Sequence, residues 1–208
     1  HNLKHSVSVI VPLHNKGRYV RDTLRSVQAQ SCRDWQALVV ENHSADEGPT
    51  IVDQIAAEDE RIRLLRAPES VAGPGAARNL GLGQANGEWI LFLDADDLLH
   101  VDHLQSLLDL AKASRAEVLA SDWAEFQDGS WTWNGKDELN GQVTASMERH
   151  HSSGSTTPAP RIPVQDSSIA YAPWAIHCGL IRKDILGSER CWVEELDRFP
   201  SEDTAFWF

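Results

Sequence analysis

"GEWILFLDADDLL", residues 87–99, is an apolar run that ends in a cluster of carboxylates. The five strongly apolar residues from Trp89 to Leu93 predict a strand that is buried on both faces. Asp94, Asp96 and Asp97 follow at once, and their like charges repel one another. The stretch therefore predicts a buried strand whose carboxyl end needs a positive charge nearby.

Apolar runs and helical repeats alternate along the first 123 residues. The predicted strands are Val7–Val11, which Pro12 is expected to end, and residues 35–42, 61–67, 88–94 and 117–123. The predicted helices between them cover residues 17–30, 50–59, 73–87 and 101–114. Strands that alternate with helices at this spacing indicate βαβ units, and so an α/β fold with a Rossmann-like, mainly parallel sheet flanked by helices.

The pattern becomes irregular beyond residue 123. Residues 125–135 predict a hairpin with Asp128-Gly129 as its turn, and the polar stretch 147–160 predicts a loop. Residues 173–186 return to an apolar strand pattern that is followed by a turn or short helix. We therefore expect one domain with a regular front half and an irregular back half.

Polar side chains follow three of the predicted strands. They are His14 and Asn15 after the first strand, Glu41 and Asn42 after the second, and Asp94, Asp96 and Asp97 after the fourth. Ligands of parallel α/β sheets bind at the carboxyl ends of the strands. This convergence therefore predicts a binding site at that edge of the sheet.

The charge of the chain limits its partners. A formal net charge of −12 over 208 residues argues against a nucleic-acid-binding surface, which needs a basic stripe. An anionic substrate would need a local cation from arginine, lysine or a metal. The sequence contains no apolar stretch long enough to span a membrane and no recognisable signal peptide.

The three cysteines are Cys32, Cys178 and Cys191, an odd number without a CxxC pair. This favours a reducing compartment over a disulfide framework and argues against a zinc site. We therefore expect a cytoplasmic protein, either free or peripheral to the membrane. The chain begins at His1 and ends in "SEDTAFWF", which is typical of a helix start, so we expect a piece of a longer protein that is truncated at its C-terminus.

The DxD pattern of Asp94 and Asp96 allows two interpretations. The carboxylates could cap the helix predicted in "VDHLQSLL", or they could hold a divalent cation. Mg²⁺ and Mn²⁺ prefer hard oxygen ligands and typically bind one or two carboxylates together with substrate phosphates. Such a cation would offset the repulsion between the aspartates.

Four parts of the chain, in this order, resemble the inverting glycosyltransferases of family 2, which have the GT-A fold. They are "SVSVIVPLHNKGRYVRDTLRSVQAQS", "WQALVVENHSADEGPT", "GPGAARNLGLGQANGEWILFLDADD", and "GLIRKDILG" with "SEDTAFWF". The resemblance implies a single GT-A domain over residues 1–208. Its nucleotide-sugar-binding part would cover about residues 1–122 and its acceptor-side part about residues 123–208.

The resemblance also implies a metal site. In that family the second aspartate of the DxD binds the metal that bridges the nucleotide diphosphate, which implies Asp96 as a metal ligand. Asp94 would lie against the metal or the ribose, and the cofactor would be Mn²⁺ or Mg²⁺. The cation would stabilise the charge that develops on the departing diphosphate. Asp97 is expected to be a helix cap or to bond to a metal-ligating side chain.

Five further residues match positions near the nucleotide in that family. Pro12, Leu13 and His14 match the strand end that lines the base, where His14 would stack on or hydrogen-bond to the base or ribose. Asn42 stands where the family has an aspartate in a "DDGS"-like stretch, here "ENHS", and its amide oxygen can still accept the uracil N3–H. Arg78 matches an arginine near the nucleotide, and its alternative role is an ion pair with the aspartate loop.

Asp203 in "SEDTAFW" matches the catalytic base of the family. An ionised carboxylate there could take the proton of an acceptor hydroxyl as that oxygen attacks the anomeric carbon, with inversion. Without the resemblance, "SED" indicates only a helix N-cap. In the irregular half, Trp131, Trp133 and Trp174 are the candidates for stacking on an acceptor sugar.

The sequence thus predicts a metal-dependent inverting glycosyltransferase that uses a nucleotide-sugar donor, most simply a UDP-sugar. A saccharide or lipid-linked molecule would be the acceptor. One alternative is a nucleotidyltransferase, for which "PLHNKGRY" offers Lys16 and Arg18 but a single glycine. Another is a catalytically inactive nucleotide-sugar-binding domain.

Overall fold

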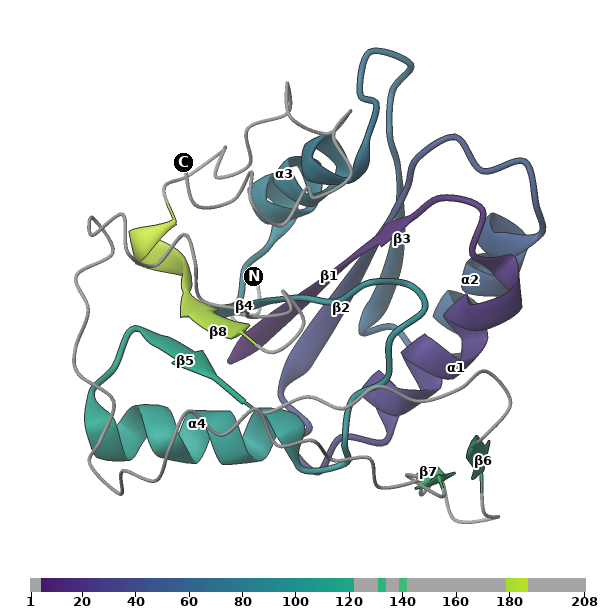
Figure 1. Ribbon diagram of the computed structural model, residues 1–208. Helices are drawn as coiled ribbons and strands as arrows, with labels where there is room; N and C mark the ends of the chain where they lie inside the picture. Colours follow the sequence, from purple (N-terminus) through teal and green to yellow (C-terminus); the bar gives the residue numbers. More distant parts are fainter. Residues whose placement is uncertain (1–4, 122–130, 134–138, 142–178, 187–208) are drawn as a thin grey trace, which may run out of the picture.

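A six-stranded sheet forms the centre of the computed structural model, which describes residues 5–121, 131–133, 139–141 and 179–186 (Figure 1). Its strand order is β3-β2-β1-β4-β8-β5. These strands are β1 (Val7–Leu13), β2 (Trp35–Glu41), β3 (Ile62–Arg66), β4 (Trp89–Phe92), β5 (Val118–Ala120) and β8 (Gly179–Arg182). The neighbours among β1 to β4 are parallel, and β8 lies antiparallel between β4 and β5. The predicted mainly parallel α/β sheet is confirmed.

Within the described residues, four α-helices cover the two faces of this sheet. They are α1 (Gly17–Gln28), α2 (Gly48–Glu58), α3 (Pro74–Gln84) and α4 (His103–Ser114). Apolar residues of α1, α2 and α4 share one buried cluster with Val7, Val9 and Val11 of β1. Helix α3 lies on the opposite face of the sheet (Figure 1), where its Ala77 and Leu82 pack in a second buried cluster. Both faces are covered, so β1 and β2 are buried along nearly their whole length.

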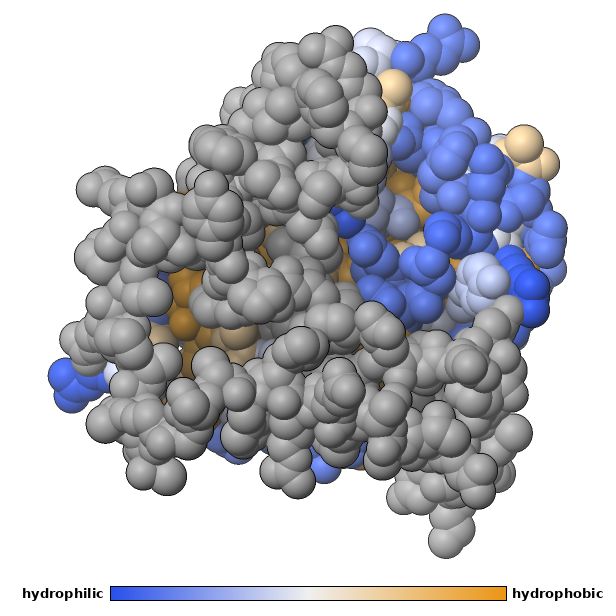
Figure 2. Space-filling model, viewed as in Figure 1, coloured by the Kyte–Doolittle hydropathy of each residue, from blue (hydrophilic) through white to orange (hydrophobic). Residues whose placement is uncertain are grey.

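The surface over α1 and α2 is mainly polar (Figure 2). In the view of Figure 2, the described residues over α1 and α2 are largely hydrophilic. None of the helices that the structure describes is long and apolar enough to cross a membrane.

Strand β1 runs through Pro12, where the sequence predicted its end. β4 pairs with β1 only from Val7 to Ile10, and the Leu93 amide donates to the Ile10 carbonyl. The next bond of this ladder would need an amide at residue 12, which proline lacks. β1 therefore continues beside β2 as far as Leu13 while β4 diverges from it.

Two short strands of the irregular half form a separate two-stranded sheet. β6 (Trp131–Trp133) pairs antiparallel with β7 (Leu139–Gly141), which follows it in the chain. The turn predicted at Asp128-Gly129 lies outside the described residues. The strand and short helix predicted within residues 173–186 are found as β8 and a 3-10 turn, η3 (Lys183–Ile185).

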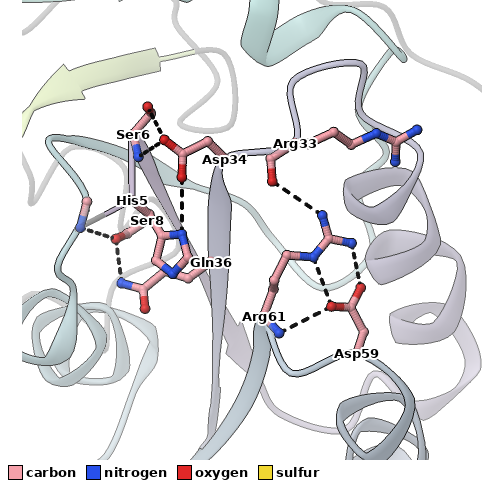
Figure 3. Close-up of polar contacts among 9 residues, drawn as sticks. His5, Ser6, Ser8, Arg33, Asp34, Gln36, Asp59 and Arg61 are labelled. Atoms are coloured by element: carbon pink, nitrogen blue, oxygen red, sulfur yellow. Dashed lines mark hydrogen bonds and ion pairs between the residues drawn. The ribbon is translucent and has the colours of Figure 1, made fainter. Parts of the chain in front are cut away.

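The amino-terminal edge of the sheet carries a polar cluster (Figure 3). Asp34 accepts hydrogen bonds from the Ser6 hydroxyl at 2.6 Å and from the Ser6 amide at 3.1 Å. Asp59 accepts two bonds from the Arg61 guanidinium, at 2.9 and 2.7 Å. That guanidinium also lies 3.9 Å from the centre of the Trp35 ring. These contacts link the segments that precede β1, β2 and β3. They lie at the amino-terminal edge of the sheet, opposite the edge at which His14, Asn42 and the aspartates follow their strands.

Candidate functional site

A cavity of about 540 Å³ opens at the carboxyl edge of the sheet. The strand order reverses between β1 and β4, and such a switch point leaves a crevice in which ligands of α/β proteins bind. The lining residues come from the end of β1, from the segments after β1, β2 and β4, and from the start of α3 with the two residues before it. They are Pro12, Leu13, His14, Lys16, Asn42, His43, Ala72, Gly73, Pro74, Arg78, Asp94, Ala95 and Asp96.

The nucleotide- and metal-site residues expected from the sequence are thus brought together in one cavity. They are Pro12, Leu13, His14, Asn42, Arg78, Asp94 and Asp96. The cavity also contains Lys16 and His43, to which the sequence assigned no part in this site. Asp203 and Trp174 lie outside the described residues, and Trp131 and Trp133 lie on β6.

Arg78 and Asp94 form an ion pair inside the cavity wall. The Arg78 side chain is 1% exposed, and its Nη2 donates to Asp94 Oδ1 at 2.6 Å. Burial raises the pKa of the Asp94 carboxyl, the Arg78 guanidinium opposes that rise, and the nearby Asp97 and Asp96 add to it. Of the two roles considered for Arg78, the ion pair with the aspartate loop is observed. A buried guanidinium needs such a partner because its charge is costly to desolvate.

The position of Arg78 depends on how closely α3 approaches the sheet. A Cβ atom at Gly81 would meet Ile10 Cγ2 at 2.5 Å, so only glycine allows this approach. Arg78 lies one helical turn before Gly81 on the same helix. The close contact of α3 with β1 therefore carries the guanidinium to the end of β4.

Lys16 and Asp96 form the second ion pair. Lys16 Nζ lies 2.5 Å from Asp96 Oδ2, and the two side chains are 40% and 37% exposed. The hydrogen bond to Asp96 raises the pKa of the Lys16 ammonium. Two basic side chains of the protein therefore lie beside these aspartates. From the sequence, a metal ion was expected to offset the repulsion between the carboxylates. The sequence could not show this pairing because residues 16 and 96 are 80 positions apart.

The aspartate loop is a turn and not a helix cap. The Asp97 amide donates to the Asp94 carbonyl at 3.1 Å, which closes the turn. α4 begins only at His103, with Asp102 at its N-cap. The helix-cap interpretations of the DxD pattern and of Asp97 are therefore wrong, because the chain makes this turn before the helix starts.

The donor set of this loop fits Mg²⁺ or Mn²⁺. Asp94 and Asp96 offer hard carboxylate oxygens at the cavity, and neither carboxylate is fully buried. Within the described ranges, no group of three or more His, Cys, Asp or Glu side chains is placed to hold a metal ion. Two carboxylates suit a cation that takes its other ligands from substrate phosphates and water.

Asn42 presents a free acceptor. Its side chain is 6% exposed, and Nδ2 donates to the Gly73 carbonyl at 2.9 Å. A carbonyl oxygen only accepts, so this contact determines which end of the amide carries the nitrogen. Oδ1 is buried without a hydrogen-bond partner among the described residues. A buried acceptor without a partner is costly, and a ligand with an N–H group would satisfy it.

His14 ties the ends of β1 and β2 together. Its Nδ1 lies 2.7 Å from the backbone carbonyl of Asn42, so this nitrogen carries the proton and donates. Its Nε2 then accepts from Asn15 Nδ2 at 3.1 Å. Both ring nitrogens are engaged, which leaves the face of the ring for a ligand. Of the two roles predicted for His14, stacking fits this geometry better than hydrogen bonding.

A row of buried polar side chains along α1 supports the aspartate loop. Thr23 Oγ1 donates to the Ala95 carbonyl at 2.9 Å, and Ser26 Oγ accepts from the Leu99 amide at 3.1 Å. Just beyond the helix, Gln30 bonds to the His100 carbonyl at 2.7 Å and the Leu104 amide at 3.0 Å. This row was not predicted from the sequence, although its spacing of three and four residues matches one helix face.

The chain is similar in sequence to glycosyltransferases. A profile of glycosyl transferase family 2 matches residues 8–169. A GalNAc(5)-diNAcBac-PP-undecaprenol beta-1,3-glucosyltransferase of Campylobacter jejuni subsp. jejuni serotype O:2 is 32% identical over 115 residues, which are 55% of this chain and 37% of that protein. The chain spans less than half the length of the curated relatives it matches.

Two solved structures have a similar fold. The crystal structure of S. aureus TarS 1-349 in complex with UDP has a TM-score of 0.70 and 25% identity, and the match covers 97% of this chain and 54% of that one. The mannosyltransferase PcManGT from Pyrobaculum calidifontis, in complex with GDP-Man and Mn²⁺, has a TM-score of 0.52 and 25% identity. That match covers 58% of this chain and 36% of the other.

Proposed function

Because this chain belongs to glycosyl transferase family 2 and has the GT-A fold, we propose that it binds a nucleotide-sugar donor and transfers the sugar to an acceptor hydroxyl. The observation that carries the proposal is the convergence of Asp94, Asp96 and the free amide oxygen of Asn42 on one cavity. The cavity lies at the switch point of the sheet. Family membership favours glycosyl transfer over the alternative of nucleotidyl transfer.

Uracil is the proposed base. The free Oδ1 of Asn42 needs a donor, and uracil supplies one at N3–H, whereas N3 of cytosine carries no hydrogen. The relationship to TarS, which was crystallised with UDP, supports this choice. Guanine also has a ring N–H donor, at N1, and PcManGT was crystallised with GDP-Man, so GDP is the competing ligand.

Calorimetry with UDP, CDP and GDP tests the base. UDP should bind at least about tenfold more tightly than CDP, because a site built to hydrogen-bond one group rejects the analogue that lacks it. Asn42→Leu should remove this preference while leaving the shape of the pocket nearly unchanged. Equal affinities of the unmodified chain for UDP and CDP would contradict uracil recognition, and a preference for GDP would replace UDP with a guanosine donor.

Mn²⁺ or Mg²⁺ is the proposed cofactor, with Asp96 and Asp94 as its protein ligands. When bound, the cation neutralises charge on the departing diphosphate. Arg78 keeps Asp94 oriented through its 2.6 Å contact. UDP binding should therefore strengthen when Mn²⁺ is added, and Asp96→Asn should remove most of that gain. UDP affinity that is the same with and without Mn²⁺ would argue against a metal-dependent enzyme.

Asp203 is the proposed general base of an inverting reaction. Its carboxylate would accept the proton of the acceptor hydroxyl as that oxygen bonds to the anomeric carbon. The bond from the anomeric carbon to the diphosphate oxygen breaks on the opposite face, and the diphosphate leaves with the electron pair. Asp203→Asn should abolish transfer and leave UDP affinity within about twofold, whereas Asp109→Asn on α4 should change neither quantity. Normal turnover of Asp203→Asn would exclude this residue as the base.

The proposed acceptor is a saccharide or a lipid-linked molecule. The Campylobacter jejuni relative bears a name that specifies an undecaprenol-linked acceptor, which supports the second class. A lipid-linked acceptor would bring a cytoplasmic protein to the membrane surface. A chain that binds UDP with metal but neither transfers nor hydrolyses any sugar of a UDP-sugar panel would instead be an inactive nucleotide-sugar-binding domain.

A further inference from the structure

The two aspartates of the cavity are held by cations of different kinds. Asp94 bonds to the guanidinium of Arg78, whose side chain is 1% exposed. Asp96 bonds to the ammonium of Lys16, whose side chain is 40% exposed. The two ion pairs therefore differ in how easily water can take the place of the basic side chain beside the carboxylate.

Arg78 cannot leave its aspartate. Withdrawal of the Asp94 carboxylate would take an ion-pair partner away from a permanently charged guanidinium inside the protein, which is strongly unfavourable. Asp94 is therefore held in place whether or not a ligand binds. A divalent cation that approaches Asp94 has to do so while this ion pair remains.

Lys16 can leave its aspartate at little cost. Its ammonium is partly hydrated already and sits on a flexible four-carbon stem, and ion pairs between exposed groups are weak. The backbone of Lys16 is fixed, because its carbonyl accepts the Tyr19 and Val20 amides at the start of α1. The side chain can therefore turn away from Asp96 while the residue stays at the cavity that it lines.

We propose that Lys16 occupies the cation position at Asp96 in the protein without donor, and that the divalent cation displaces it when it enters with the nucleotide diphosphate. The inference rests on the proposed function. The displaced ammonium remains beside the cavity, where the negative phosphates attract it. Lys16 thus opposes binding of the metal alone and favours binding of metal and diphosphate together. This makes Lys16 a positioning residue that couples the two ligands.

Binding of Mn²⁺ alone tests the competition. Electron paramagnetic resonance of free Mn²⁺ at low ionic strength measures the affinity of the unmodified chain and of Lys16→Gln, Lys16→Arg and Lys112→Gln. Lys16→Gln should bind Mn²⁺ about threefold to tenfold more tightly, because the competing charge is gone. Lys16→Arg keeps a competing cation and should bind no more tightly than the unmodified chain.

Lys112→Gln is the matched control for overall charge. Lys112 lies on α4, 3.7 Å from Asp109 and away from the residues that line the cavity. Its variant should keep the affinity of the unmodified chain. An unchanged Mn²⁺ affinity of Lys16→Gln would overturn the proposal, and so would an equal increase in Lys112→Gln, which would reveal only the general field of the protein.

The coupling between the ligands is the second readout. The factor by which saturating Mn²⁺ tightens UDP binding should fall by about threefold or more in Lys16→Gln, because the metal alone then binds better and the diphosphate loses a cation. An unchanged factor would overturn the proposal. A failure of the proposed function would give another result. Mn²⁺ would then have no effect on the UDP affinity of the unmodified chain, and the UDP affinity of Asp96→Asn would equal that of the unmodified chain.

Discussion

Asn15 and His43 hold left-handed backbone at matching places beside the cavity. Each lies two residues after a strand end, with φ of 52° and 60°. Asparagine and histidine tolerate this region better than most residues, and the "DDGS" stretch of the family places glycine at the position of His43. Asn15 Oδ1 accepts the Ala45 amide at 2.8 Å, and His43 Nε2 lies 2.8 Å from the Val71 carbonyl. These contacts hold the two turns in place.

Asp59 is the residue whose charge should contribute most clearly to stability. Hydrogen bonds from the Arg61 guanidinium lower the pKa of the Asp59 carboxyl to about 2 (Figure 3). Burial of the carboxyl acts in the opposite direction and raises its pKa, but by less. An unfolded aspartate has a pKa of about 3.9. The pair therefore stabilises the folded state above about pH 4, and this contribution disappears as the pH falls toward 2.

Asp59→Asn should lower the free energy of unfolding at pH 7 by about 1–2 kcal/mol, after allowance for solvent screening. Roughly half of this difference should be gone at pH 3, since the carboxyl of the unfolded chain is then protonated. Urea unfolding at the two pH values measures both. Asp53→Asn is the control, because Asp53 and its partner Arg66 are 55% and 59% exposed. Equal losses in the two variants would contradict a special role of Asp59.

Helices α1 and α2 begin at the same carboxylate. Asp46 Oδ2 accepts the Gly17 amide at 2.7 Å, and Asp46 Oδ1 accepts the Gly48 amide at 3.0 Å. The two helix starts lie so close that a Cβ atom at Gly17 would meet the Gly48 amide nitrogen at 2.8 Å. One negative charge at two helix N-termini satisfies orphan amides and complements both helix dipoles. This contact holds the segment after β1 against the segment after β2, and both line the cavity.

Asp46→Ala should lower the free energy of unfolding by about 1–3 kcal/mol, because it removes a capping bond from each of two helices. It should also weaken UDP binding, since the segments that carry His14 and Asn42 lose their link. Glu47→Ala is the control: Glu47 occupies the N-cap of α2 but makes no side-chain capping bond. Urea unfolding and calorimetry measure the two effects, and a Glu47 variant as unstable as the Asp46 variant would refute the shared cap.

The molecule as a whole is acidic, yet its cavity contains two cations. The formal net charge is −12, while Lys16 and Arg78 both line the site. Asp94 and Asp96 of the same cavity balance these two cations, so a diphosphate meets a local charge near zero and not the negative average of the chain. The lining comes from the ends of three strands and the start of one helix, so a ligand there connects half of the strands of the six-stranded sheet with α3.

A ligand that bridges these elements should stabilise the whole fold. UDP with Mn²⁺, each at about 100 times its dissociation constant, should raise the melting temperature by about 5 °C or more, because ligand binds only the folded state. Asp96→Asn should lose most of the increase, and Asp109→Asn, at an exposed position of α4, should keep it. Differential scanning fluorimetry measures the shift. A full increase in Asp96→Asn would show that this carboxylate takes no part in binding.

Local pattern was sufficient for the elements and for the edge at which the site lies. Strands β1 to β5 and helices α1 to α4 all fall on the predicted segments, because apolar periodicity reports which side of an element is buried. The edge followed from a rule of parallel sheets, and the cavity is found there. The apolar pattern did not predict that β1 continues through Pro12 or that β6 pairs with β7. Both features depend on hydrogen bonds to a neighbouring strand, which the pattern of one strand does not contain.

Contacts between distant segments decided the electrostatics of the site. Periodicity carries no information on which charges meet, so the pairing of Lys16 with Asp96 and the support of Ala95 by Thr23 emerge only from the packing of α1. The orientation of the Asn42 amide likewise depends on the Gly73 carbonyl. The sequence alone placed the aspartates at the end of a buried strand. Only the tertiary structure, by bringing basic side chains within hydrogen-bond distance and burying one of them, determined which cation lies beside each carboxylate.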